Sequence, residues 1–141
     1  MILTLAQLIA IHEAVILKTG RQNMKTEKIK AKLTVEPLQF TMEERKKLKI
    51  TIAATNLQDD VIDPELYRAR LFINDRDSLI WADTISNGLR ETKWFALPPG
   101  ETVFMTWSSL GEFLFPSPGE FILVLRLGDM ELAPIQVQVN V

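Results

Sequence analysis

The first twenty residues carry their hydrophobic side chains at a different period from the rest of the chain. Six side chains, all apolar except one histidine, recur at helical spacing: Leu5, Leu8, Ile9, His12, Val15 and Ile16. Thr4, followed three positions later by Gln7, is typical of a capped helix start, and Gly20 is typical of a helix end. The pattern predicts one amphipathic helix within residues 1–20, over about residues 5–19.

Beyond a polar, aperiodic linker at residues 21–27, apolar and polar residues alternate with a period of two. The alternation is clearest at residues 28–35 and 47–55, which predict half-buried β-strands. Further strands are expected at residues 66–73, 78–82, 92–96, 101–108, 120–127 and 135–141. The strand at 120–127 is apolar on both faces, which predicts a central position, whereas Pro134 predicts an edge or a bulge for the last strand.

Turn-forming residues separate these strands, and no helical pattern is recognised between them. The turns are expected at Asn74-Asp75, Asn87-Gly88, Pro98-Pro99-Gly100 and Gly128-Asp129. The sequence therefore predicts an all-β, antiparallel immunoglobulin-like β-sandwich of about seven to eight strands over residues 28–141, preceded by one N-terminal amphipathic α-helix.

Residues 97–127 resemble the closing half of bacterial immunoglobulin-like domains. The resemblance rests on a Pro-Gly-Glu turn at 99–101 that leads into a strand, and on a second Pro-Gly-Glu-aromatic turn at 118–121 that opens a late hairpin. Among such domains the sequence is most similar to the intracellular proteinase inhibitor family of bacilli. That resemblance implies inhibition or regulation of a proteinase, and no inhibitory residue is assigned from it.

Residues 1–20 resemble the opening helix of the death-on-curing (Fic-like) toxin family. The catalytic motif of that family, His-Pro-Phe-x-x-Gly-Asn-Lys-Arg, does not occur in the sequence. The resemblance therefore implies no toxin activity, and it leaves a role as an accessory protein associated with a toxin–antitoxin system as a second alternative.

Composition removes most enzyme chemistry. The 141 residues include no cysteine and a single histidine, His12. Disulfides, thiolate metal sites, cysteine nucleophiles and two-histidine metal triads are thereby excluded, and no glycine-rich phosphate loop is present. We expect no enzyme activity, no cofactor and no metal. Four acids in residues 59–65 leave a calcium loop open, but loop solvation and helix capping explain them equally well.

Charge is distributed unevenly although the formal net charge is only −2. Residues 1–50 hold ten Lys/Arg against five acids, and residues 51–141 hold six against thirteen. The lysines alternate with apolar residues at strand spacing and have no interleaved aromatic residues, so we expect a solvated strand face that deters edge-to-edge pairing, and no nucleic-acid site.

Two segments are candidates for binding another protein. Phe113, Leu114 and Phe115 fall between two expected strands, where large apolar side chains either anchor a partner or fold back as a plug over the sandwich. On the expected helix, Leu8 and Val15 mark an apolar face that needs a cover. Because the outer strand faces are polar, we expect that cover to be a second copy or another protein, a protease among the candidates.

These observations favour a non-enzymatic protein-interaction module, with an intracellular proteinase inhibitor as the alternative. The first twenty residues lack a basic n-region and a small-residue cleavage site, and they are too short and polar to span a bilayer. We expect a cytoplasmic protein that binds no membrane.

Overall fold

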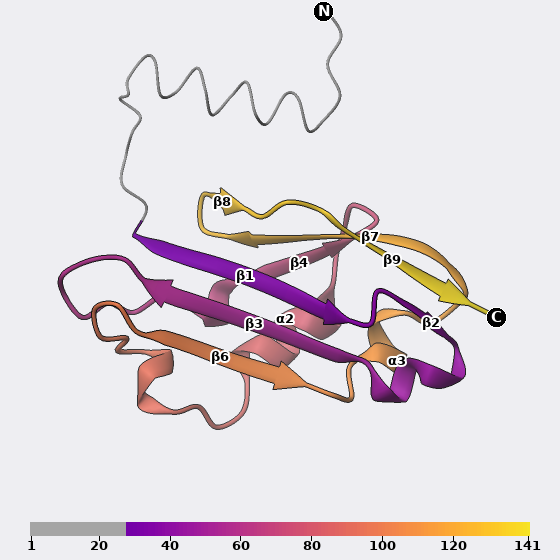
Figure 1. The fold of residues 1–141 in the computed structure, drawn as a ribbon, viewed down its shortest axis with the longest axis horizontal. Coiled ribbons are helices and arrows are strands. Elements are labelled where there is room, and N and C mark those ends of the chain that lie inside the picture. The colour runs from indigo at the N-terminus through magenta and orange to yellow at the C-terminus, as the bar shows by residue number, and fades with distance from the viewer. Residues whose placement is uncertain (1–27) are drawn as a thin grey trace, which may run out of the picture.

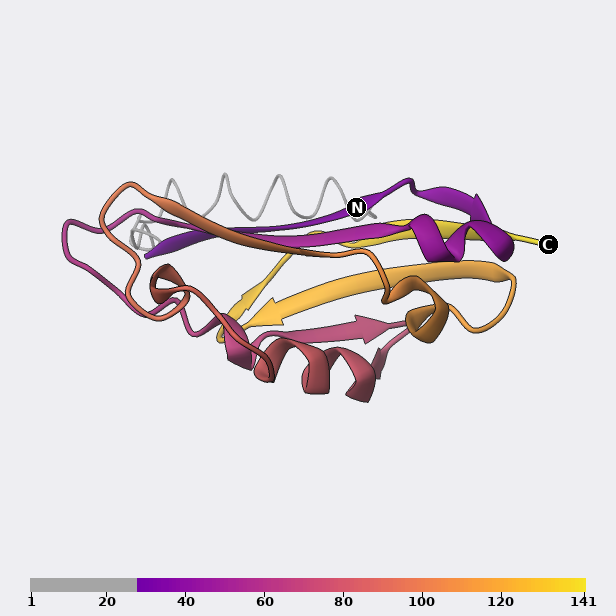
Figure 2. The same ribbon diagram turned by 90° about the horizontal axis from the view of Figure 1, so that it is seen from below.

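The computed structural model describes residues 28–141, so the helix and linker expected at residues 1–27 lie outside the described part. The described chain forms two β-sheets packed face to face (Figures 1 and 2). The first sheet has the order β1 (Ile29–Glu36), β3 (Lys49–Asn56), β6 (Thr102–Trp107). The second has the order β2 (Gln39–Thr41), β9 (Ile135–Asn140), β7 (Gly119–Leu127), β4 (Arg70–Ile73), β5 (Arg76–Asp77), and β8 (Met130–Glu131) pairs with β7.

The period-two alternation of the sequence directs one face of each sheet into a common core. In the first sheet Ile52 lies opposite Leu33 of β1 and Met105 of β6, and Ile52 is fully buried. In the second sheet Leu125 lies opposite Leu71, and both are buried. Each such leucine or isoleucine contributes about 1.5–3 kcal/mol by leaving water, which makes this shared layer the main source of stability.

The expected positions of β7, β1 and β9 in the sheets are confirmed, with one qualification for β9. β7 lies in the middle of the second sheet, and β1, with exposed lysines at 28, 30 and 32, is an end strand of the first. β9 follows Pro134 and is an edge only along its first half, because β2 pairs with Gln138 to Asn140. That pairing is parallel, so the sandwich is not wholly antiparallel as expected.

Two of the expected strands are helical, and the expectation of no helix between the strands is wrong. Residues 79–86 form α2 (Leu79–Ser86) and residues 92–94 form the 3₁₀ helix η3 (Thr92–Trp94). The Ser78 side chain accepts a hydrogen bond from the backbone N–H of Trp81, which starts the helix. Trp81 and Ile85, four residues apart, form its buried face, a spacing that the five-residue window at 78–82 could not reveal.

α2 packs against β4 and lies next to it in Figure 2. The Trp81 indole N–H donates to the carbonyl of Ala69, just before β4, at 3.0 Å. On its other side the Trp81 ring meets the Trp107 ring of β6 edge to face, with centroids 5.4 Å apart. One tryptophan therefore joins the helix to both sheets, where two further strands were expected.

Three shorter helices lie in the connections. These are η1 (Glu43–Lys47), η2 (Leu66–Arg68) and α3 (Gly111–Leu114). Two expected turns are confirmed: Asn74 and Asp75 both have positive φ between β4 and β5, and Gly100, with φ 75°, follows Pro98-Pro99. No helix within residues 28–141 is long and apolar enough to cross a membrane.

Candidate functional site

The structure separates the three apolar residues expected to bind a partner. Phe113 is 61% exposed, whereas Leu114 and Phe115 are buried. The Phe115 ring packs edge to face between the rings of Phe40, at 5.6 Å, and Phe121, at 5.2 Å. Phe115 and Leu114 therefore form the plug that the sequence left open as an alternative, and only Phe113 remains available to a partner. Leu8 and Val15 lie outside the described residues.

Arg45 of η1 holds this plug in place. Its Nε donates to the carbonyl of Met42 at 2.7 Å, and a guanidinium nitrogen donates to the carbonyl of Phe115 at 2.9 Å. The neighbouring Gly111 allows the close approach, because a Cβ there would collide with the Arg45 carbonyl oxygen. The end of the sandwich formed by α3 and η1 is thus closed by hydrogen bonds to backbone carbonyls.

The opposite end, near η2 and η3, exposes apolar side chains instead. We call it the aromatic end and define it by Tyr67, Leu89, Arg90, Trp94 and Phe95. The Tyr67 and Phe95 rings lie 6.4 Å apart, and both line a hollow of about 280 Å³ that Gly88 and Arg90 also line. Leu89, between those two residues, is 96% exposed, and Phe95 is 49% exposed. Tyr67 and Phe95 therefore form an exposed apolar surface at the hollow, and Leu89 is exposed next to two of its lining residues.

Arg90 gives the aromatic end its rigid floor. A guanidinium nitrogen donates to the carbonyl of Thr84 at 3.0 Å, which satisfies the C-terminal end of α2, and the guanidinium lies over the buried Trp94 ring at 5.1 Å. Burial lowers the pKa of the Arg90 guanidinium. Its Nε is buried without a hydrogen-bond partner among the described residues. The charge is therefore fixed beside the hollow and is not fully satisfied by the protein.

An ion pair ties η3 to the first sheet. The Lys93 ammonium lies 2.7 Å from a carboxylate oxygen of Glu101, directly before β6. The hydrogen bond and the charge of Glu101 raise the pKa of Lys93.

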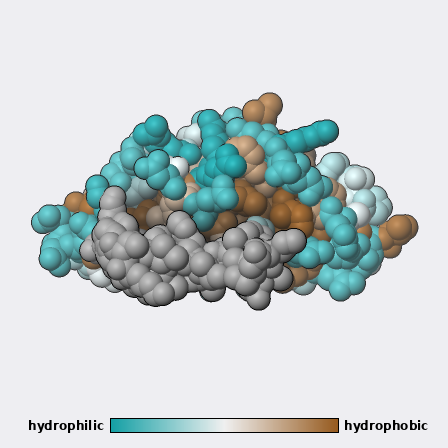
Figure 3. Space-filling view, turned by 90° about the horizontal axis from the view of Figure 1, so that it is seen from above, coloured by the Kyte–Doolittle hydropathy of each residue, from teal (hydrophilic) through white to brown (hydrophobic). Residues whose placement is uncertain are grey.

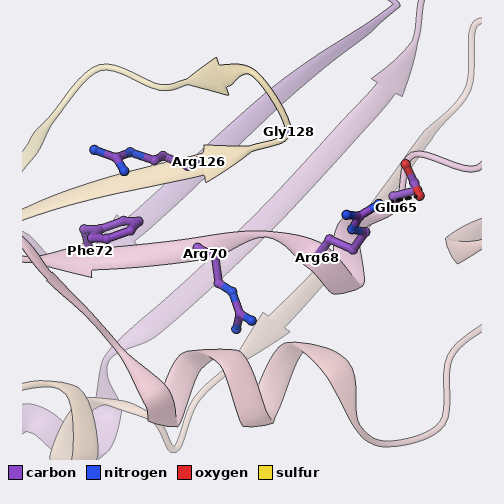
Figure 4. Close-up of a pocket in the computed structure, with 6 residues that line it drawn as sticks. All are labelled: Glu65, Arg68, Arg70, Phe72, Arg126 and Gly128. Atoms are coloured by element: carbon purple, nitrogen blue, oxygen red, sulfur yellow. Dashed lines mark hydrogen bonds and ion pairs between the residues drawn. The ribbon is translucent and has the colours of Figure 1, made fainter.

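A second hollow, of about 390 Å³, lies on the outer face of the second sheet and is lined by three arginines (Figure 4). Arg70 and Arg126 are paired across β4 and β7, and Arg68 is bonded to Glu65. Arg126 lies 4.2 Å from the centroid of the Phe72 ring and donates to Glu131 at 2.8 Å. Figure 4 shows Arg70 and Arg126 directed apart, so the three cations do not converge on one point.

Asn56, a buried polar residue at the end of β3, forms hydrogen bonds that hold the loop after β3. Its side-chain nitrogen donates to the carbonyls of Asp60 and Leu97, each at 2.8 Å, and its side-chain oxygen accepts from the backbone N–H of Gln58 at 2.7 Å. Val61, at the top of this loop, is 59% exposed. A single asparagine therefore fixes the shape of an exposed loop.

Two of the four acids left open as a calcium loop have structural partners. Asp63 accepts a hydrogen bond from the backbone N–H of Glu65, and Glu65 pairs with Arg68 at 3.3 Å. Within residues 28–141 no group of three or more acids or histidines is arranged to hold a metal ion.

The two packed sheets place the domain in the class of immunoglobulin-like β-sandwiches. Similar solved structures include a β-glucosidase from Listeria innocua in complex with isofagomine, with a TM-score of 0.48 and 14% identity. That likeness covers 80% of this chain and 16% of the β-glucosidase chain.

The CARDB domain of a Pyrococcus furiosus protein, in complex with di-metal ions, has a TM-score of 0.46 and 12% identity. It covers 83% of this chain and 99% of that domain. The chain thus spans only a small part of the β-glucosidase, and both likenesses concern the fold alone. No protein-family model and no curated protein matches the sequence.

Sequence reasoning missed the aromatic end because residues 92–96 were expected to form a strand whose tryptophan is in the core. Four of the five residues that define the aromatic end fall within residues 89–95, whereas Tyr67 is distant in sequence. Trp94 is indeed buried. The one available signal was Leu89 itself, a large apolar residue between the turn glycine Gly88 and Arg90.

Proposed function

We propose that this domain is a non-enzymatic protein-interaction module that binds its partner through the aromatic end. The observation that carries the proposal is that the exposed Tyr67 and Phe95 line one hollow together, and that the exposed Leu89 stands in the chain between Gly88 and Arg90, which also line it. Large apolar side chains gathered on a surface are costly to leave in water, and they are typical of binding anchors when an arginine lies among them. Arg90 supplies that arginine.

The rigid floor supports binding at this end. Arg90 and Trp94 hold the connection that carries Leu89, so little conformational entropy is lost when a partner covers it. The partner surface that fits is apolar where it meets Tyr67, Leu89 and Phe95.

The proposal is tested by partner capture with two matched variants. Leu89→Asp places a charge at the centre of the aromatic end, and we expect loss of the bound partner. Leu79→Asp is the control, because Leu79 is 79% exposed at the start of α2, away from this end. Its variant should retain the same partner. Equal capture by both variants would exclude the aromatic end as the binding surface.

Proteinase inhibition is a second candidate, and the loop braced by Asn56 favours it. A bound inhibitor presents an exposed segment whose shape survives contact with the protease. Asn56 holds residues 58–60 with two hydrogen bonds and is itself bonded to the carbonyl of Leu97. We expect the protein to slow a subtilisin-like serine protease at stoichiometric amounts and to remain uncleaved. Digestion at the loop without any slowing would exclude this candidate and leave the interaction module unaffected.

A further inference from the structure

The sandwich has an open seam along β1, at which the two sheets do not meet. β1 ends the first sheet, and no described strand pairs with its free edge. Across the seam lie the β7–β8 hairpin and the first half of β9. Two hollows follow one another along it, of about 300 Å³ and 540 Å³. Together they form a groove alongside β1, which we call the seam groove.

The walls of the seam groove are mainly apolar. β1 contributes Ile29, Ala31 and Leu33, and the second sheet and its connections contribute Leu125, Leu127, Met130, Leu132 and Ile135. Several of these, including Ala31, Met130, Leu132 and Ile135, are only partly buried. Figure 3 views the molecule from the β8 side and shows hydrophobic residues gathered in the middle of this face, between hydrophilic ones. The core thus reaches the surface along the seam.

The sequence predicts an apolar helix face in the residues that come shortly before this groove in the chain. The described residues begin at Lys28, which lines the groove, and twenty-seven residues precede it. Among those, the stripe with Leu8 and Val15 at its centre needs a cover, because an isolated helix of about fifteen residues is only marginally stable. The expectation of an outside partner was based on polar strand faces, and it did not consider a seam between the sheets.

The length of the expected helix is close to the length of β1, which runs along the groove. A helix over residues 5–19 would be about 22 Å long, and β1 with its eight residues is about 26 Å long. The connection at residues 20–27 extends to at most about 29 Å, enough to turn the chain back along β1. A tether this short gives an effective concentration in the millimolar range, so even modest affinity keeps the groove occupied.

We propose that the amphipathic segment at residues 5–19 binds in the seam groove of its own chain and completes the core along β1. A second copy of the chain and a different protein are the competing occupants. The groove and the hollow of the aromatic end share Asp63 in their lining but no residue that either proposal or its test uses, so failure of either proposal leaves the other standing.

The test is disulfide trapping in the full chain, which has no native cysteine to interfere. Leu8→Cys is combined with Ala133→Cys, an exposed residue that lines the groove and whose replacement leaves the core intact. The matched control is Gln7→Cys with Ala133→Cys, because Gln7 has the same tether but lies on the polar side of the helical pattern. Circular dichroism melting confirms that both variants fold.

We expect the Leu8 pair to form an intramolecular disulfide at least about tenfold faster than the Gln7 pair, at a rate independent of protein concentration. Equal rates for the two pairs would show that the segment does not occupy the groove. Disulfide-linked dimers whose formation rate rises with concentration would show that a second copy occupies it. Either of these results overturns the proposal.

Discussion

The two ends of the sandwich handle apolar connections in opposite ways. At the α3 end, Phe115 turns inward between two other rings, and Arg45 bonds to the backbone that carries it. At the aromatic end, Arg90 bonds to backbone in a similar way, yet Leu89 and Phe95 remain outside. An apolar connection therefore does not by itself indicate a binding surface. Whether such a connection exposes a binding surface depends on which backbone carbonyls the anchoring arginine binds and on which side chains that contact leaves in solvent.

The largest expected contrast is in the free energy of unfolding after aromatic truncation. Phe115→Ala removes a fully buried ring and leaves a cavity, so we expect a loss of about 3–5 kcal/mol. Phe95→Ala removes a half-exposed ring, and we expect a loss below about 1 kcal/mol. Urea unfolding of the two variants measures both values. Similar losses would mean that the two ends do not differ as described.

A smaller effect is expected from the arginine that closes the α3 end. Arg45→Met keeps much of the side-chain volume but leaves the carbonyl of Phe115 without its donor and that of Met42 with only the longer backbone bond from Arg45, at 3.4 Å. We expect a loss of about 1–3 kcal/mol in the free energy of unfolding. The adjacent, exposed Lys46→Met is the control, with an expected change within about 0.5 kcal/mol. If the control loses as much, the carbonyl contacts of Arg45 are not what stabilises this end.

Some elements of the fold could be predicted from sequence, whereas α2 and the apolar segment at the α3 end could not. The strand around Ile52 was predictable because a period of two over eight residues repeats enough to be recognised. The strand around Leu125 was predictable because a short run bounded by turn residues is apolar on both faces. α2 was not, since its two buried side chains, Trp81 and Ile85, provide a single helical repeat. Of the Phe113 to Phe115 segment, composition showed only that it is apolar. The inward direction of Phe115 involves Phe40 and Arg45, which are distant in sequence.

A small, pH-dependent effect is expected from the ion pair that ties η3 to β6. The pKa of Lys93 is raised in the folded protein by Glu101, so the pair stabilises the fold below the ordinary lysine pKa of 10.5 and ceases to do so as the pH rises through the folded value. The melting temperature of Lys93→Met should lie slightly below that of the unsubstituted protein at about pH 8, and the gap should close at about pH 12. A gap that widens with pH would contradict this assignment.

The smallest expected change in stability carries the most weight for function. Leu89 is 96% exposed, so Leu89→Ser removes almost no buried surface, and the free energy of unfolding should change by no more than about 0.5 kcal/mol. If Leu89 instead packed into the hollow beside Tyr67, its loss would cost about 1.5–3 kcal/mol, as for a buried leucine. Urea unfolding separates these two cases. A neutral result means that a large apolar side chain stays in water without stabilising the fold, which is the condition that the proposed binding surface requires. A large loss would mean that the aromatic end is a second plug like the one around Phe115.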